Sequence, residues 1–252
     1  VRLKEYSYNL DGMDIVEEAI RVYKSGDIAP HIIGTVGSIN ADEYEQLKEK
    51  GYALNDVLGK SGIEKAMENE LRGTSGTRAI ELLNGTVVSD SVAEEAIPGN
   101  TIKLTFDLDY QDKVQQILEN HIYWLRHQTS SNAKGMTGNA GAIVVTDVKT
   151  GAILAAATSP TYDINDYLEN YTAVANGENS PLINRATSGL YRPGSTFKTV
   201  TATAGLNYGI IDRSTTVTCN KVYTYWDDYQ PKCTGYHGRI NVITALEKSC
   251  NI

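Results

Sequence analysis

Apolar side chains recur at the spacing of an α-helix in two parts of the chain. Between Met13 and Tyr23 the apolar residues share one helical face, and Ser25-Gly26 would end that helix. A longer stripe lies near the middle of the chain and consists of Val114, Ile117, Leu118, His121, Ile122 and Leu125. Both segments are predicted to form amphipathic helices that bury one face.

Two shorter helices are predicted from capping boxes, in which an Asn or Ser side chain is followed three residues later by Glu. The boxes are Asn40 with Glu43, before a helix that stops at Gly51, and Ser61 with Glu64, before a helix that ends at Arg72-Gly73. Each predicted helix therefore has a start signal and a glycine stop.

Strands are predicted where apolar runs alternate with polar residues or flank a turn. Ala79 to Leu83 and Thr86 to Ser89 flank Asn84-Gly85, which is a strong signal for a tight β-hairpin. Thr101 to Phe106 alternates and predicts a further strand. The part of the chain before this strand has no constellation of catalytic residues, so we interpret it as a scaffold or partner surface.

A second hairpin is predicted later in the chain. The apolar runs Ala142 to Val145 and Ala152 to Ala157 flank Lys149-Thr150-Gly151. Gly151 would supply the backbone angle that a tight turn needs. We therefore interpret this Lys-Thr-Gly as a turn and not as part of an active site.

The segment Tyr191 to Lys198 contains the candidate chemistry. Pro193 and Gly194 interrupt the chain, and a breaker-free run then predicts a helix with Ser195 in its first turn. Residues three apart share a helical face, so the Lys198 amine is expected beside the Ser195 hydroxyl. A serine hydroxyl becomes a good nucleophile when an adjacent base takes its proton. Backbone N–H groups at the helix start could stabilise an oxyanion.

Ser-x-x-Lys alone is weak evidence, because a capping serine with a solvated lysine gives the same pattern. A second element, Ser249-Cys250-Asn251, follows later in the chain. Ser-x-x-Lys followed by Ser-x-Asn and then Lys-Thr-Gly is the motif set of penicillin-binding proteins and serine β-lactamases. The pair of motifs strengthens the case for Ser195 as a nucleophile.

Composition excludes some classes of protein. The chain has 23 basic and 31 acidic residues, and the net charge of −8 argues against a nucleic-acid partner. Its 252 residues, 41% of them hydrophobic, suit one or two domains with a core. No run approaches the ~18 apolar residues that span a bilayer, and no signal peptide is recognised at Val1.

The motifs and several further stretches resemble a class B penicillin-binding protein. The stretches that carry the resemblance are His31 to Ile39, Leu58 to Gly73, Pro98 to Gln111, Ala140 to Asn165, Asn184-Arg185-Ala186, Tyr191 to Lys198, and His237-Gly238 ahead of Ser249. They cover nearly the whole chain in the order of the family. The resemblance implies an α+β fold in which residues 1–98 form a dimerisation-type pedestal and residues 99–252 form the first part of a serine β-lactamase-like α/β transpeptidase domain.

The resemblance also implies roles for four residues. Ser195 would attack the penultimate D-alanine carbonyl of a peptidoglycan stem peptide, and Lys198 would take its proton. Ser249 would relay a proton to the leaving amine, and Asn251 would hydrogen-bond the substrate amide. Ser195 and Asn251 thus also bind substrate. No cofactor and no metal take part in this chemistry.

The implied function is a D,D-transpeptidase that cross-links stem peptides and is the target of β-lactams. The implied setting is the extracytoplasmic face of the bacterial membrane, and the implied partner is a membrane glycan polymerase. Homodimerisation through the pedestal is a further alternative. A penicillin sensor or degenerate scaffold is an alternative. A serine β-lactamase is disfavoured, because it usually lacks a pedestal such as residues 1–98.

The order of the family's motifs leads to expectations about the ends of the chain. The family's Lys-Thr/Ser-Gly strand follows Ser-x-Asn, so it is expected beyond Ile252, and the membrane anchor is expected before Val1. That strand supplies half of the oxyanion hole, whose loss costs about 3 kcal/mol. The 252-residue piece is therefore expected to be inactive by itself. The Ala142 to Ala157 hairpin is expected to expose an unpaired edge.

The cysteines leave three alternatives open. Cys219 and Cys233 could form a disulfide outside the membrane, with a contribution of roughly 3 kcal/mol, or remain free thiols. Together with His237 they could also hold a metal, since Cys-x13-Cys-x3-His resembles ligand spacing. Cys250 is expected to point away from substrate and to serve packing.

Overall fold

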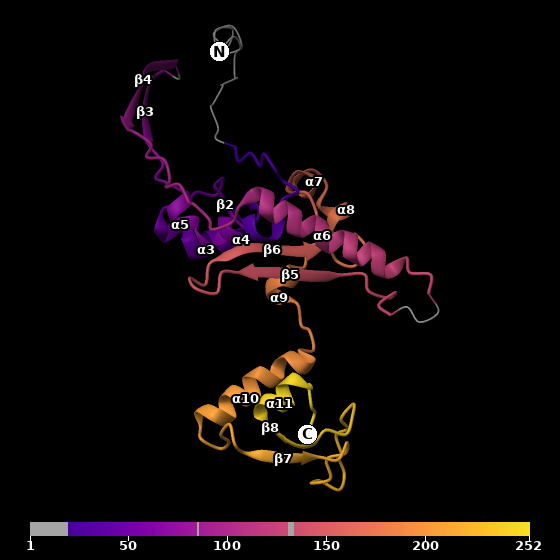
Figure 1. Ribbon diagram of the computed structural model, residues 1–252. Helices are drawn as coiled ribbons and strands as arrows, with labels where there is room; N and C mark the ends of the chain where they lie inside the picture. The colour runs from indigo at the N-terminus through magenta and orange to yellow at the C-terminus, as the bar shows by residue number, and fades with distance from the viewer. Residues whose placement is uncertain (1–19, 85, 131–133) are drawn as a thin grey trace. The chain divides into compact units, whose positions relative to one another are not determined.

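The computed structural model describes residues 20–84, 86–130 and 134–252, which belong to two compact units (Figure 1). The first unit ends at Gly189 and the second runs from Leu190 to Ile252. Helices and strands are mixed in both units, which confirms the predicted α+β class. The domain boundary predicted between residues 98 and 99 stays a prediction.

The first unit begins with short elements around a small core. They are α2 (Pro30–Ile33), β1 (Val36–Ser38), α3 (Ala41–Leu47), η2 (Lys48–Lys50), β2 (Val57–Gly59), α4 (Gly62–Ala66) and α5 (Glu68–Leu71). Strands β1 and β2 pair antiparallel. Ile39, Tyr52 and Leu58 are buried together beneath them.

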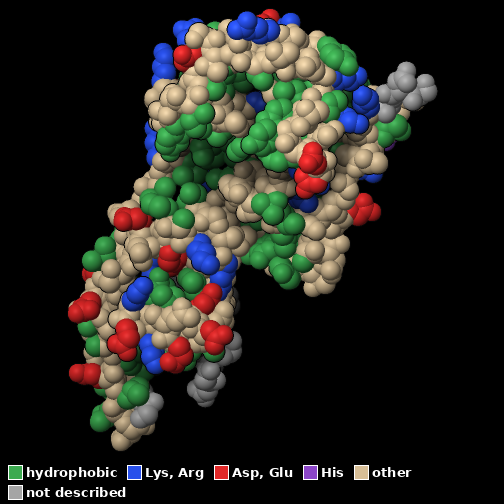
Figure 2. Space-filling model, turned by 90° about the horizontal axis from the view of Figure 1, so that it is seen from below, with side chains coloured by type: hydrophobic (Ala, Val, Ile, Leu, Met, Phe, Trp, Pro, Cys, Tyr) green, Lys and Arg blue, Asp and Glu red, His purple; other side chains and the backbone are tan. Residues whose placement is uncertain are grey.

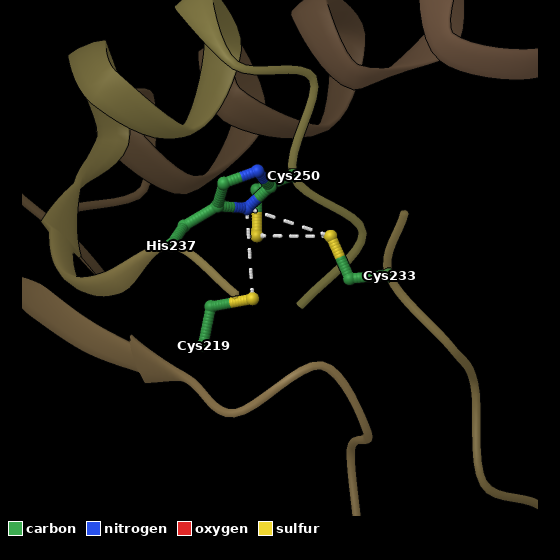
Figure 3. A group of neighbouring side chains, drawn as sticks. All are labelled: Cys219, Cys233, His237 and Cys250. Carbon is green, nitrogen blue, oxygen red and sulfur yellow. Dashed lines mark hydrogen bonds between the residues drawn. The ribbon is translucent and has the colours of Figure 1, made fainter. Parts of the chain in front are cut away.

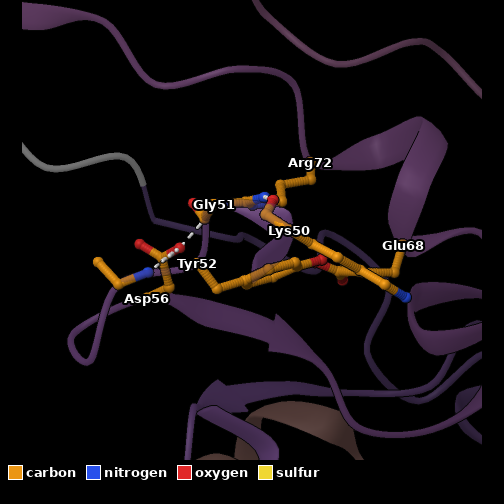
Figure 4. A network of polar contacts seen from close by, with 7 residues as sticks. Lys50, Gly51, Tyr52, Asp56, Glu68 and Arg72 are labelled. Atoms are coloured by element: carbon orange, nitrogen blue, oxygen red, sulfur yellow. Dashed lines mark hydrogen bonds and ion pairs between the residues drawn. The ribbon is translucent and has the colours of Figure 1, made fainter. Parts of the chain in front are cut away.

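A polar network joins α5 to the loop before β2 (Figure 4). The Arg72 guanidinium lies 3.5 Å from the centroid of the Tyr52 ring and donates to Asp56 Oδ2 at 3.0 Å. The Tyr52 hydroxyl donates to Glu68 at 3.1 Å, and the other Glu68 oxygen accepts from the Gly59 N–H at 2.7 Å. The Tyr52 ring face and hydroxyl thus contact two residues of α5 and its end, and Glu68 also binds Gly59, so the network ties α5 to β2.

The first predicted capping box is confirmed. Asn40 Oδ1 accepts the Glu43 N–H at 2.9 Å, and the Glu43 carboxylate accepts the Asn40 N–H at 2.9 Å. Helix α3 and the turn η2 then stop at Gly51, whose φ is 78°. A left-handed glycine ends the helix as the sequence predicts.

The second predicted capping box is wrong, although α4 does begin after Ser61. The Ser61 hydroxyl accepts the Thr35 N–H at 3.1 Å instead of capping the helix. Glu64 is buried and pairs with Arg21 at 2.7 Å. Both side chains have tertiary partners, which override the local signal. The helix also breaks at Met67, between α4 and α5.

The first predicted hairpin is confirmed and is longer than predicted. Strands β3 (Thr77–Leu83) and β4 (Thr86–Glu94) pair antiparallel. Asn84 adopts a φ of 52° at the turn, and Gly85 lies outside the described residues. The apolar side chains that remain exposed on it are Ile80, Leu82, Leu83, Val87, Val88 and Val92.

A long helix packs on the second predicted hairpin to form the main core. Helix α6 (Leu108–Arg126) lies against β5 (Gly141–Thr146) and β6 (Ile153–Ser159), which pair antiparallel. Val114 and Leu118 from the predicted stripe are buried against Ala155 and Ala157. Short helices α7 (Ile164–Glu169), α8 (Tyr171–Ala175) and α9 (Arg185–Ser188) complete the unit.

Two glutamines of α6 occupy the outer edge of β6. Gln111 is fully buried, accepts the Ala156 N–H at 2.8 Å and donates to the Ala156 carbonyl at 3.2 Å. One turn later, Gln115 makes the same two bonds to Thr158, at 3.3 and 2.9 Å. The side-chain amides therefore replace a neighbouring strand. The predicted unpaired edge is covered on this side of the hairpin.

Two predictions in this unit need correction. Thr101 to Phe106 is wrong as a strand, because this extended segment has no ladder partner among the described residues. A single side-chain bond, from Thr105 to the Ile153 carbonyl at 2.6 Å, ties it to β6. The helix predicted from Met13 to Tyr23 lies mostly outside the described residues, and Ile20 to Tyr23 are not helical.

The second unit contains two helices and a two-stranded sheet. Its elements are η3 (Gly194–Thr196), α10 (Phe197–Asn207), β7 (Thr216–Cys219), β8 (Gly238–Asn241) and α11 (Val242–Glu247). Strands β7 and β8 pair antiparallel, with Cys219 opposite Gly238. The buried core consists of Cys219, Cys233, Ile240 and Cys250.

The surface carries charges of both signs. Figure 2 shows acidic and basic side chains interspersed on the visible face, with hydrophobic side chains between them. This face therefore does not form a basic binding surface. Within the described residues, no helix combines the length and apolarity needed to cross a bilayer.

Candidate active site

Ser195 lies in a tight turn directly before a helix. Gly194 has a φ of 56°, and the turn η3 then leads into α10. The Thr196 hydroxyl donates to the Pro193 carbonyl at 2.6 Å and fixes the turn. Ser195 is exposed, and its position at the helix start matches the prediction, although the α-helix itself begins two residues later, at Phe197.

Ser249 is placed by the C-terminal end of α11. The Ser249 N–H donates to the Leu246 carbonyl at 3.1 Å, and the Cys250 N–H donates to the Ala245 carbonyl at 2.8 Å. Many helices end with this pair of bonds, and the first residue after such a helix has a left-handed backbone and is usually glycine. Here that position is Ser249, at a φ of 49°. A serine there costs about 1 kcal/mol relative to glycine. The chain has a serine here, and not a glycine, despite that cost.

The structure brings the four predicted site residues together. Lys198 Nζ donates to the Ser249 carbonyl at 2.6 Å, to Ser249 Oγ at 3.0 Å and to Asn251 Oδ1 at 2.6 Å. Ser249 Oγ donates to Ser195 Oγ at 2.8 Å. Asn251 Nδ2 donates to the Lys232 carbonyl at 3.0 Å. One lysine thus holds both side chains of the Ser-x-Asn motif.

The path from Lys198 to Ser195 runs through Ser249. The sequence predicts a direct contact, because residues three apart share a helical face. The described hydrogen bonds instead join Lys198 to Ser249 and Ser249 to Ser195. The turn η3 moves Ser195 off the regular α-helical face of Lys198. Both bonds point from the lysine towards Ser195, the direction in which a proton returns to Ser195. Carrying a proton from Ser195 to the lysine requires a neutral amine and the reversal of both bonds.

Lys149-Thr150-Gly151 forms the turn of the β5–β6 hairpin, as predicted. Asp147 Oδ1 accepts the N–H groups of Lys149 and Thr150 at 2.7 and 2.9 Å. Those bonds lower the pKa of the Asp147 carboxyl. Gly151 has a φ of 75°. The prediction of a structural turn is confirmed.

Three cysteines and a histidine converge behind the Ser-x-Asn motif (Figure 3). The ligand atoms of Cys219, Cys233, His237 and Cys250 all lie within 4.8 Å of one another. His237 Nδ1 is 3.6 Å from Cys219 Sγ and 3.5 Å from Cys233 Sγ, and Cys233 Sγ is 3.8 Å from Cys250 Sγ. The three sulfurs are buried. We call these four residues the thiol–imidazole cluster.

The thiol–imidazole cluster fits a tetrahedral zinc ion. Three cysteines and one histidine are a common donor set of structural zinc sites. Zn–S bonds of ~2.3 Å and a Zn–N bond of ~2.0 Å at tetrahedral angles separate two sulfurs by ~3.8 Å and a sulfur from the nitrogen by ~3.5 Å. The Cys233–Cys250 separation of 3.8 Å and the two sulfur–nitrogen separations of 3.5 and 3.6 Å agree with these values, and the other three pairs lie within 4.8 Å.

Backbone groups around the thiol–imidazole cluster favour a thiolate. The Asn251 N–H donates to Cys233 Sγ and the Ile252 N–H donates to Cys250 Sγ, both at 3.4 Å. Backbone bonds from Gly235 and Asn251 lower the pKa of the Cys233 thiol, whereas burial raises the pKa of Cys250. All three cysteines are free, so the disulfide between Cys219 and Cys233 is not formed.

Sequence reasoning missed Cys250 as a member of the thiol–imidazole cluster. It predicted that Cys250 turns away from substrate and packs, and its side chain is indeed buried at 5% exposure. Cys250 lies between two predicted site residues, Ser249 and Asn251, and far from Cys219 and Cys233 in the sequence. In an extended chain successive side chains point to opposite sides, so Cys250 is expected on the side opposite to Ser249 and Asn251. That alternation was the signal that could have placed Cys250 in the thiol–imidazole cluster.

Comparison with protein-family models gives two matches. The penicillin-binding protein dimerisation domain matches residues 1–104, and the penicillin-binding protein transpeptidase domain matches residues 141–252. The Ser195, Lys198, Ser249 and Asn251 site lies within the second match.

Individual relatives agree with these matches. The chain is 32% identical to the peptidoglycan D,D-transpeptidase MrdA of Escherichia coli K12, over 97% of this chain and 38% of the relative. It is 31% identical to MrdA of Acinetobacter baumannii, over 99% of this chain and 36% of the relative. The chain therefore spans less than two fifths of the length of these relatives.

A solved structure has a similar fold. The complex between penicillin-binding protein PBP2 and MreC from Helicobacter pylori matches with a TM-score of 0.71. The match has 22% sequence identity and covers 91% of this chain and 41% of that chain.

Proposed function

Because the chain belongs to the class B penicillin-binding proteins, we propose that the protein containing it is a serine D,D-transpeptidase that cross-links peptidoglycan stem peptides. The observation that carries the proposal is the hydrogen-bond path from Ser195 through Ser249 to Lys198. It joins a nucleophile to a base across residues from two separate helix ends.

The proposed reaction has two stages. Ser195 Oγ attacks the carbonyl carbon of the D-Ala–D-Ala peptide bond, and its proton passes through Ser249 to a neutral Lys198 amine, with both hydrogen bonds of the path reversed. The C–N bond then breaks, and the leaving D-alanine amine takes that proton back through Ser249. In the second stage an amine of a neighbouring stem attacks the ester, loses a proton along the same path, and restores the Ser195 hydroxyl.

Asn251 and the Ser195 backbone position the substrate in this proposal. Asn251 Oδ1 is held by Lys198 and its Nδ2 by the Lys232 carbonyl, so the amide has a fixed orientation. A fixed amide can accept and donate to the stem-peptide backbone with little loss of entropy. The Ser195 N–H, in the turn η3 directly before α10, donates to the developing oxyanion.

The proposal includes a location and partners. Stem peptides lie on the extracytoplasmic face of the bacterial membrane, so the protein acts there, anchored by a segment before Val1. The Helicobacter pylori relative was solved with MreC, and a protein partner of this kind is proposed here too. A membrane glycan polymerase would supply the strands to be cross-linked, and β-lactams would acylate Ser195.

Acylation of the full-length protein tests the proposal. Incubation with a fluorescent penicillin is expected to give one adduct per chain, on the peptide that contains Ser195 by mass spectrometry. Incubation with donor and acceptor stem peptides is expected to give a cross-linked product. An adduct without cross-linked product would instead favour the sensor, and rapid penicillin hydrolysis would favour the β-lactamase. An adduct on another residue would contradict the assignment of Ser195.

The thiol–imidazole cluster supports a second candidate function, the retention of one zinc ion. Cys219, Cys233, His237 and Cys250 would hold it, and the ion would act structurally because four protein ligands leave no open position. Metal analysis of the purified full-length protein is expected to give one zinc per chain and much less for Cys219→Ala. Equal zinc contents in the two proteins would contradict the assignment.

A further inference from the structure

We propose that an exposed group of aromatic side chains beside the candidate active site binds the glycan strand that carries the stem peptide. We call this group the aromatic platform, and its members are Tyr223, Tyr225, Trp226 and Tyr229. The inference rests on the proposed function, because a peptidoglycan stem is attached to a glycan. It is carried by the geometry of the rings, by the composition of their loop and by the connection of that loop to Asn251.

The rings of the aromatic platform contact one another and remain open to solvent. The Trp226 ring centroid lies 5.4 Å from that of Tyr223 and 5.3 Å from that of Tyr225. The Tyr229 centroid lies 6.4 Å from that of Trp226. Tyr225 is 75% exposed, Tyr229 65% and Trp226 47%. Aromatic rings are rigid, so they bind with little loss of side-chain entropy, and a contiguous exposed group of them marks a binding site.

The loop that carries the aromatic platform offers the two kinds of contact that a sugar needs. All residues from 224 to 230 are exposed, and their sequence, Thr-Tyr-Trp-Asp-Asp-Tyr-Gln, has no aliphatic side chain. The C–H groups of a sugar ring pack against the electron-rich face of an aromatic ring. Sugar hydroxyls can donate to Asp227 and Asp228 and can bond to the Gln230 amide. Within the described ranges, these three side chains have no hydrogen bond or ion pair, so they are available.

The charge of this loop disfavours other ligands. Asp227 and Asp228 place two negative charges between the rings, and residues 224–230 include no lysine or arginine. A nucleic acid or an anionic lipid would be repelled. The centre of a protein–protein interface is depleted of charged residues, whereas the carboxylates here lie in the middle of the group. A neutral chain rich in hydroxyl groups fits both the rings and the carboxylates.

The base of the loop is joined to the candidate active site. Val222 pairs with Lys232 in a β-bridge, and the Tyr223 N–H donates to the Pro231 carbonyl at 2.9 Å. The Lys232 carbonyl also accepts from Asn251 Nδ2 at 3.0 Å. The aromatic platform therefore begins beside the segment that orients Asn251. A peptide spans at most ~3.5 Å per residue, so a short stem bound in the site keeps its glycan within about 20 Å.

The link between stem and glycan makes a weak sugar site effective. Once the stem is bound, the aromatic platform meets the sugar at an effective concentration in the mM range. A sugar dissociation constant about 10-fold below that concentration raises the affinity for the whole substrate by about the same factor. The sugar is remote from the reacting atoms, so this contact is equal in the ground state and the transition state. It lowers KM and leaves kcat unchanged.

Substrates with and without glycan test the proposal in the full-length protein. Trp226→Ala is expected to raise the KM for cross-linking of glycan-linked stems by about 10-fold, with little change in kcat. The KM for free stem peptides is expected to stay the same. Calorimetric titration with peptide-free glycan strands gives a readout that does not depend on catalysis, and binding is expected to weaken by about 10-fold. Trp226→Phe keeps a ring and is expected to recover most of the affinity.

Matched variants separate the aromatic platform from general effects of losing a ring. Trp124→Ala removes a tryptophan of α6 that is 57% exposed, and it is expected to leave glycan binding and both KM values unchanged. Tyr225→Ala removes the most exposed ring of the platform, where folding is least at risk, and it is expected to weaken glycan binding by about 3- to 10-fold. Its control is Tyr208→Ala, which removes a ring that is 78% exposed in the same unit.

The outcomes distinguish this proposal from the proposed function. Unchanged glycan binding in Trp226→Ala and Tyr225→Ala would overturn the glycan site, and so would equal rises in KM for glycan-linked and free stems. If these variants kept glycan binding but lost a protein partner, the aromatic platform would be a protein interface instead. Penicillin carries no glycan, so the absence of any acylation of Ser195 in the unaltered protein would overturn the proposed function alone. Binding of peptide-free glycan would still decide the role of the aromatic platform.

Discussion

Lys198→Met is expected to slow the acylation of Ser195 by about 10²- to 10⁴-fold, the range that a positioned general base contributes. The methionine side chain has a similar length but cannot accept the proton that Ser249 passes on. It also cannot donate to Ser249 Oγ and Asn251 Oδ1, which lie 3.0 and 2.6 Å from the amine. The second-order rate constant with fluorescent penicillin, in the full-length protein, measures the effect.

The matched control is Lys248→Met, which removes an exposed lysine at the end of α11. It is expected to leave the rate constant unchanged. Melting temperatures of both variants report whether the lost bond to the Ser249 carbonyl unfolds the site. A folded Lys198→Met protein that is acylated at the normal rate would show that another group serves as the base.

Gln111→Ala is expected to destabilise the protein by about 2–4 kcal/mol. The glutamine side chain satisfies both backbone groups of Ala156, and each buried group left without a partner costs ~1–3 kcal/mol. Because Gln111 is fully buried, water cannot take its place without opening the contact between α6 and β6. Unfolding in urea gives the free energy, and hydrogen exchange of the Ala156 amide gives a local readout.

Gln116→Ala provides the comparison for this loss. Gln116 is an exposed glutamine of the same helix, and within the described ranges its side chain bonds only to Asp112, at 2.7 Å. Its replacement is expected to change the free energy of unfolding by no more than about 0.5 kcal/mol. Equal effects of the two variants would mean that helix propensity, and not the edge of β6, determines the cost.

Local signals predicted an element well where its side chains had no other partner. Asn40 and Glu43 are exposed, so nothing competes with their reciprocal bonds and the capping box forms. Ser61 and Glu64 carry the same signature, but Thr35 and Arg21 take both side chains. The difference lies in tertiary contacts, which a short sequence window does not contain.

The sequence predicted the residues of the candidate site more completely than the elements of the fold. Ser195 and Lys198 lie at the start of α10 and Ser249 and Asn251 follow α11, and the four side chains meet as the two motifs predict. The relay through Ser249 could not be predicted, because it depends on the turn η3 and on the left-handed backbone of Ser249. The place of Cys250 in the thiol–imidazole cluster also depends on contacts with Cys233, which is distant in sequence.

Gln111 and Gln115 cover the outer edge of β6, so a further strand can be added to the β5–β6 sheet only at the edge of β5. Among the described residues, β6 is the only strand paired with β5, so β5 alone offers an open row of backbone groups. If a second copy paired its own β5 with this β5, the open backbone groups of both copies would be hydrogen-bonded to each other. The resulting two-fold contact is closed, whereas a sheet open on both sides would add copies without limit. For the described part of the chain, misassembly through this hairpin should therefore end at pairs instead of fibres.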